Sequence, residues 1–138
     1  MRTALDTNII STQWAGTGRA PEMTTLLDDC RREGSLIVAG VVYAELLARP
    51  NSSIGLVNEY LISTGIEIAL ETSAELWEQA GSAYADYCRR RSQSGGGESK
   101  RLLADFIIGA HAMRNADRLA TLDPARYRAA FPDLVLIP

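Results

Sequence analysis

Short apolar segments alternate with helical patterns along the chain, and this alternation constrains the fold more than any other feature. An apolar run, a helical pattern and a second apolar run are typical of a parallel sheet covered by helices. We expect strands at residues 4–5, 35–39, 66–68, 119–122 and 134–137. We expect helices from about residue 9 and over residues 22–33, 41–49, 54–64, 72–91, 102–115 and 124–130. The sequence therefore predicts an α/β/α sandwich.

The composition sets the class of protein. With 138 residues, 46% hydrophobic and 22% charged, the chain suits one globular domain over residues 1–138. No apolar run approaches the ~18 residues of a membrane span, and none resembles a signal peptide. Cys30 and Cys88 lie far apart and outside any metal-binding spacing, which favours two separate thiols. We expect a cytoplasmic protein with no membrane partner.

The charge is unevenly distributed. Residues 1–87 carry five basic and twelve acidic side chains, whereas residues 88–138 carry nine basic and five acidic ones. Thirteen of the fourteen basic residues are arginine, whose planar guanidinium suits phosphate. Two interpretations stay open, an RNA-facing side or an ordinary solvated surface. Basic residues also flank the glycine-rich loop at 92–99, as candidate RNA contacts or as charges that complement a helix C-terminus: Arg89, Arg90, Arg91, Lys100 and Arg101.

The first nine residues after Met1 contain the first candidate site residue. Ala4 and Leu5 lead directly into Asp6, and a tight turn through Thr7 and Asn8 is expected before the helix near Ile9. In open α/β sheets, ligands bind outside the carboxyl ends of the strands. Asp6 is therefore either part of a functional site or an N-cap for the following helix.

Three further acids occupy apolar segments. Glu45 and Asp105 interrupt apolar helices, and Asp123 follows an apolar strand as Asp6 does. Each acid could instead have a purely structural role: it could pair with an arginine, interact with the dipole of a helix from its first turn, or act as an N-cap. A shared hard cation, Mg²⁺ or Mn²⁺, would compensate all four together and would activate water against a phosphodiester. Polar neighbours that would support the acids, or simply cap turns, are Thr7, Asn8 and Thr121.

Four segments together resemble a known family. They are Leu5–Ile9, Val42–Leu46, Ala104–Ala112 and Leu119–Asp123, the last leading to Tyr127 and Phe131, and their acids are spaced by 39, 60 and 18 residues. The chain resembles a PIN-domain ribonuclease of the VapC/FitB toxin type along nearly its whole length.

The resemblance implies the fold, activity and partners of that family. These are a parallel five-stranded sheet with helices on both faces, an acidic Mg²⁺ or Mn²⁺ pocket and endonucleolytic cleavage of RNA. Homodimerisation and inhibition by a cognate antitoxin are implied as well. The acidic positions of the family fall on Asp6, Glu45, Asp105 and Asp123, and its polar companions on Thr7, Asn8 and Thr121.

Several other residues are not assigned to the candidate site. Gly109 stands where the family more usually has alanine, and we expect this to change little. His111 lies about 120° from the site-facing direction of its helix and is interpreted as a packing residue. Asp117 is interpreted as a solvated turn acid, and Glu71 as one of several solvated acids.

Two other functional classes are considered. A binding module that keeps the scaffold without turnover would act through dimerisation or a partner protein, but it has no reason to bury four acids. A phosphohydrolase with Asp6 as nucleophile needs a second acid two residues later, where Asn8 stands.

Overall fold

The computed structural model describes residues 1–71, 73–95 and 101–138. Five strands form one fully parallel sheet in the order β3-β2-β1-β4-β5. The strands are β1 (Arg2–Leu5), β2 (Ser35–Val38), β3 (Ile66–Ile68), β4 (Arg118–Ala120) and β5 (Leu136–Ile137). The helices are α1 (Thr7–Ala15), α2 (Ala20–Glu33), α3 (Gly40–Leu47), α4 (Ile54–Thr64), α5 (Ala74–Gln93), α6 (Leu103–Asn115) and α7 (Ala125–Arg128).

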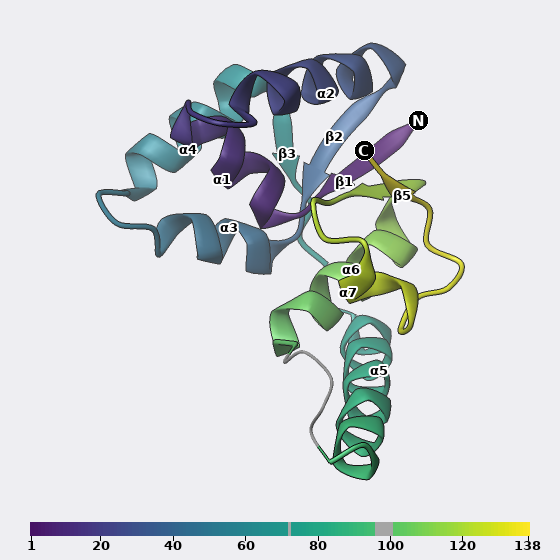
Figure 1. Cartoon of the computed structure of the whole chain (residues 1–138). Coiled ribbons are helices and arrows are strands. Elements are labelled where there is room, and N and C mark those ends of the chain that lie inside the picture. The colour runs from purple at the N-terminus through teal and green to yellow at the C-terminus, as the bar shows by residue number, and fades with distance from the viewer. Residues whose placement is uncertain (72, 96–100) are drawn as a thin grey trace.

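The order of the strands determines where the helices lie. From β1 the chain moves outward through β2 to β3, and it then returns to the other side of β1 to form β4 and β5. Because parallel crossovers are right-handed, this reversal moves the helices to the opposite face. Figure 1 shows α1 to α4 on one side of the sheet and α5 to α7 on the other. The predicted three-layer sandwich with a five-stranded parallel sheet is confirmed.

The centre of the sheet is apolar on both faces. Thr3, Ala4 and Leu5 of β1 are all at most 3% exposed, as are the last three residues of β2. Strands covered on both faces cannot alternate apolar and polar residues, which is why they appear in the sequence as short continuous apolar runs. The cysteines are free thiols, Cys30 buried and Cys88 exposed. Within the described residues, no helix combines the length and apolarity that a membrane crossing requires.

The first helix begins earlier than expected. The predicted turn through Thr7 and Asn8 is wrong, because α1 starts at Thr7, directly after Asp6. The Asp6 backbone N–H donates to the Ala120 carbonyl at 2.9 Å, which extends the β1–β4 ladder by one residue, and the Asp6 carbonyl accepts the Ile9 N–H of the first helical turn. The Asp6 side chain forms no capping hydrogen bond. The N-cap interpretation of this carboxylate therefore does not hold.

The ends of the fifth helix differ from the predicted ends by about two residues. Ser73 occupies its N-cap position, and Thr72, the first residue of the expected helix, lies outside the described part of the chain. The helix runs to Gln93, so it includes the first two residues of the segment predicted as a glycine-rich loop. Residues 96–100 of that segment lie outside the described residues.

The sixth helix corrects the expectation about Gly109. A Cβ at this position would overlap three ring atoms of Phe131. The absence of a side chain therefore lets the Phe131 ring pack against the α6 backbone, and alanine would not be a neutral replacement.

The segment after β3 is fixed against α6. His111 is 2% exposed and its Nε2 lies 2.7 Å from the Ala69 carbonyl oxygen, which agrees with the predicted packing role. Glu71 was expected to be solvated, but it accepts hydrogen bonds from Ser73, Arg114 and Asn115. These bonds, that from Ser73 first, lower the pKa of Glu71 to about 2. Asp117 is exposed in its turn as predicted, and it also accepts a hydrogen bond from the Arg2 backbone N–H.

Candidate active site

Asp6 lies where the strand order reverses, between the carboxyl ends of β1 and β4. Its side chain is 4% exposed, and its Oδ2 accepts hydrogen bonds from the Thr121 hydroxyl at 2.7 Å and the Tyr127 hydroxyl at 2.9 Å. Burial raises the pKa of Asp6, and the two hydroxyl donors offset part of that increase. The two hydroxyl donors thus orient the carboxylate, which forms no ion pair with the residues that the structure describes.

Glu45 and Asp105 reach the same edge of the sheet from different helices. Glu45, half-buried on α3, accepts a hydrogen bond from the Thr7 hydroxyl, and its pKa is raised by burial and by the charges of Asp6 and Asp105. Asp105, in the first turn of α6, is 7% exposed and its Oδ2 accepts the Leu102 backbone N–H at 3.2 Å. The structure therefore brings these three predicted acids close enough to repel one another.

The predicted polar companions connect α1 to the loop after β4. Asn8 accepts the Leu122 backbone N–H through its Oδ1 at 3.1 Å and contacts the Thr121 hydroxyl at 3.4 Å. The Thr121 hydroxyl in turn accepts the Asp123 backbone N–H at 3.1 Å. Thr7, Asn8 and Thr121 thus hold the carboxylates and the backbone around them in place.

Asp123, the fourth predicted acid, joins the group only through Arg126. Its side chain is 43% exposed, and its Oδ2 lies 2.7 Å from Nε of Arg126. The Nη1 atom of the same guanidinium lies 3.5 Å from Oδ1 of Asp105. Burial lowers the pKa of Arg126, but the charges of Asp105, Asp123 and Asp6 outweigh it and the pKa is raised. Arg126 is therefore the positive charge that this acidic site contains.

The donor set has the chemistry of a site for a hard cation. Carboxylate oxygens are the ligands that Mg²⁺ and Mn²⁺ prefer. Burial first, and then neighbouring carboxylates, raise the pKa of Asp6 and of Glu45, and a cation would stabilise the ionised form of both. The spacing is wider than a closed centre requires. Across residues 1–71, 73–95 and 101–138, no three His, Cys, Asp or Glu side chains lie close enough to hold an ion together. The residues fit the cation by chemistry, with Arg126 between two of them.

Two residues that contact the site acids are not predicted from the sequence. Tyr127 lies in a segment that resembles the family, and the structure shows that its hydroxyl donates a hydrogen bond to Asp6 and that its side chain is fully buried. Arg126 was not singled out, although its spacing of three residues from Asp123 is typical of a helical ion pair. No local signal connects either residue to Asp6 or Asp105, because those contacts span more than 20 residues of chain.

The predicted RNA contacts divide into two groups. Arg101 lies beside the site, since its Nη2 donates to the Ala125 carbonyl of α7 at 2.9 Å. Arg89 and Arg91 hydrogen-bond to Asp86 and Tyr87 on their own helix. Lys100 lies outside the described residues. In Figure 1 the end of α5 that carries the arginine run projects away from the sheet.

The fold and the site define a class of protein. A parallel sheet with acids gathered at its topological switch point is an α/β architecture that binds a ligand at that edge. A family model described as PIN domain matches residues 3–132, so the chain belongs to the PIN-domain family. No curated protein sequence matches the chain.

Solved structures share the fold at low sequence identity. VapBC2 of Rickettsia felis, bound to a DNA fragment from its promoter, is 21% identical, with a TM-score of 0.68 over 99% of this chain and 98% of the other. VapBC-1 of nontypeable Haemophilus influenzae is 18% identical, with a TM-score of 0.66 over 99% and 97%. FitAcB of Neisseria gonorrhoeae is 20% identical, with a TM-score of 0.61 over 99% and 96%.

Proposed function

We propose that the chain is a Mg²⁺- or Mn²⁺-dependent endoribonuclease of the VapC/FitB type. The observation that carries this proposal is the convergence of Asp6, Glu45 and Asp105 at the switch point of a PIN-domain sheet, where burial and mutual repulsion raise the pKa of the first two. Mutually repelling, desolvated carboxylates are costly for a fold, and they suit a site whose partner is a cation.

Each side chain has a distinct part in the proposed reaction. Asp6, Glu45 and Asp105 would hold the cation, and Asp123 would support it. A bound divalent cation would lower the pKa of a water molecule and neutralise charge that develops on the phosphodiester. The Thr121 and Tyr127 hydroxyls orient Asp6, and the Thr7 hydroxyl orients Glu45. Without the cation, the carboxylates repel the RNA backbone and keep it out of the site.

The partners are proposed from the same resemblance. We propose a cognate antitoxin as protein partner, a homodimer as the assembled state, and RNA in the cytoplasm as substrate. The similarity to the VapBC and FitAcB structures supports a partner protein, and the similarity covers almost all of each chain. Arg101, which donates a hydrogen bond to α7, is a candidate RNA contact.

A binding module without turnover is the second candidate. It is favoured by the ion pairs of Arg126 with Asp105 and Asp123, which leave the site partly neutralised without a metal. Calorimetric titration with Mg²⁺ and Mn²⁺ separates the two functions, because absence of binding at millimolar metal supports the module.

The decisive experiment measures cleavage of RNA by the purified chain. A 5′-labelled RNA of mixed sequence is incubated with Mg²⁺, with Mn²⁺ or with EDTA, and with the variants Asp105→Asn and Asp29→Asn. Asp29 is the matched control, because it is a surface acid of α2 that already pairs with Arg32. We expect EDTA to stop cleavage and Asp105→Asn to reduce it by at least ~100-fold, while Asp29→Asn is unchanged. Full activity of folded Asp105→Asn would exclude the proposal.

A further inference from the structure

Arg126 lies between two acids of the site rather than beside one. Its Nε pairs with Asp123 at 2.7 Å, three residues earlier on the same turn, and its Nη1 faces Asp105 of α6 at 3.5 Å. The Asp123 pair follows from local spacing, whereas the Asp105 contact connects two separate elements. One guanidinium therefore bridges α7 and α6 across the acidic site.

The same side chain influences the acids that it does not touch. Burial raises the pKa of Glu45, and the charge of Arg126 offsets part of that rise, while the charge of Asp6 helps to raise the pKa of Arg126. Among the described residues, no other arginine or lysine forms an ion pair with any of the four acids. Within the described part of the chain, this one guanidinium is therefore the positive charge that pairs with the acids of the site.

A guanidinium and a divalent cation that share the same carboxylates oppose each other electrostatically. An ion ligated by Asp105 would lie within a few ångströms of the Arg126 guanidinium, and two positive charges at that distance in a partly desolvated site repel strongly. The Arg126 side chain is 45% exposed, so it can move into solvent when it leaves the two carboxylates.

We propose that Arg126 is a built-in competitor of the divalent cation: its guanidinium neutralises Asp105 and Asp123 in the metal-free protein and is displaced when the ion binds. The inference rests on the proposed function, because it assumes that the acids bind a metal. Arg126 of α7 would then raise the metal concentration at which the site becomes occupied. A guanidinium that must be displaced weakens metal binding, and its removal strengthens it.

The test measures Mn²⁺ binding directly, without RNA. Free Mn²⁺ is followed by its electron paramagnetic resonance signal at pH 7 in wild type, Arg126→Gln, Arg126→Lys and Arg128→Gln. Arg128 is the matched control: it lies on the same helix, its removal changes the net charge equally, and its side chain forms no hydrogen bond or ion pair with the described part of the chain. The lysine variant keeps the charge but not the planar fork.

We expect Arg126→Gln to bind Mn²⁺ about tenfold more tightly than wild type, and Arg128→Gln to differ from wild type less than twofold. Arg126→Lys should fall between wild type and Arg126→Gln, and it stands in if the glutamine variant fails to fold. Equal affinities of the two glutamine variants, or weaker binding by Arg126→Gln, would overturn the inference and leave the metal site intact. If wild type and all variants leave Mn²⁺ free, the proposed function fails and this inference fails with it.

Discussion

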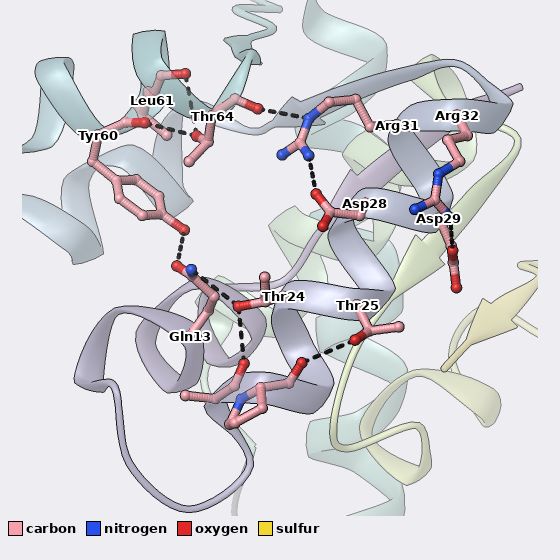
Figure 2. Close-up of polar contacts among 12 residues, drawn as sticks. Gln13, Thr24, Thr25, Asp28, Asp29, Arg31, Arg32, Tyr60, Leu61 and Thr64 are labelled. Carbon is pink, nitrogen blue, oxygen red and sulfur yellow. Dashed lines mark hydrogen bonds and ion pairs between the residues drawn. The ribbon is translucent and has the colours of Figure 1, made fainter.

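Acids at two places in this molecule are compensated in opposite ways. On α2, Asp28 and Asp29 each pair with an arginine one turn later, Arg31 and Arg32, and all four side chains are well exposed. Figure 2 shows the first pair continuing into α4, where Nε of Arg31 donates to the Thr64 carbonyl at 3.0 Å. At the strand ends, Asp6 and Glu45 accept hydrogen bonds from hydroxyl groups and form no ion pair within the described residues, and Asp105 shares Arg126 with Asp123.

The two groups of acids differ in the sequence distance between each carboxylate and the charge that compensates it. A surface acid with an arginine at i+3 is compensated by local sequence, and the pair contributes little to stability because water already solvates both charges. The carboxylates at the strand ends come from separate elements and are desolvated together, so their compensation depends on the tertiary fold or on a ligand. A ligand that neutralises such carboxylates and binds only the folded state would stabilise the fold.

The largest effect is expected from Asp6→Asn. RNA cleavage should fall by at least ~100-fold, while the metal-free protein becomes more stable at pH 7. The pKa of Asp6 is raised in the folded state, so its ionisation opposes folding as pH rises above the ordinary value of 3.8. The gain in stability should therefore vanish near pH 3. Thermal unfolding at both pH values and a cleavage assay measure this.

Asp29→Asn is the control for that variant, because it removes the same charge from the exposed α2 pair. It should leave both cleavage and the pH dependence of unfolding close to wild type. A loss of stability by Asp6→Asn at pH 7 would contradict the idea that the carboxylate opposes folding.

The next largest effect is a difference in the stability lost when each of two tyrosines is replaced by phenylalanine. Tyr127 donates to the Asp6 carboxylate, whereas Tyr60 donates to Oε1 of the neutral Gln13 side chain at 2.6 Å, as Figure 2 shows. Bonds to charged acceptors are the stronger, so Tyr127→Phe should lower the free energy of unfolding by about 1.5–3 kcal/mol and Tyr60→Phe by about 0.5–1.5 kcal/mol. Urea unfolding at pH 7 measures both. Equal losses would mean that the charge on Asp6 does not strengthen the hydrogen bond that it accepts from Tyr127.

A smaller effect is expected at Glu71, which combines features of both regions. Like the α2 acids it pairs with an arginine, Arg114, but the pair joins separate elements and the Glu71 side chain is only 16% exposed. Its pKa is about 2 against an ordinary 4.5, so its contribution is full above about pH 4.5 and is lost as pH falls towards 2. Glu71→Gln should cost about 1–2 kcal/mol at pH 7 and almost nothing at pH 2. A cost that does not change with pH would assign the effect to packing.

Local patterns made most of the fold and three of the site acids predictable. The strands appeared as apolar runs because both faces of the sheet are covered, and Asp6, Glu45 and Asp105 stood out as charges within apolar segments. The start of α1 at Thr7 was missed because it depends on the Asp6–Ala120 backbone bond, whose partners are far apart in the sequence. The need for glycine at 109 depends in the same way on the distant ring of Phe131.

The smallest effects are expected within the α2 pairs themselves. Arg31 is already held by the Thr64 carbonyl, whereas Arg32 is 75% exposed, so less side-chain entropy is lost when Asp28 pairs with Arg31 than when Asp29 pairs with Arg32. Asp28→Asn should therefore cost up to about 1 kcal/mol and Asp29→Asn no more than about 0.3 kcal/mol, both declining in 1 M salt. Urea unfolding at low and high salt measures the two values. If the order reverses, the contact with α4 does not preorganise Arg31, and exposed pairs on this surface are equivalent whatever else their arginines touch.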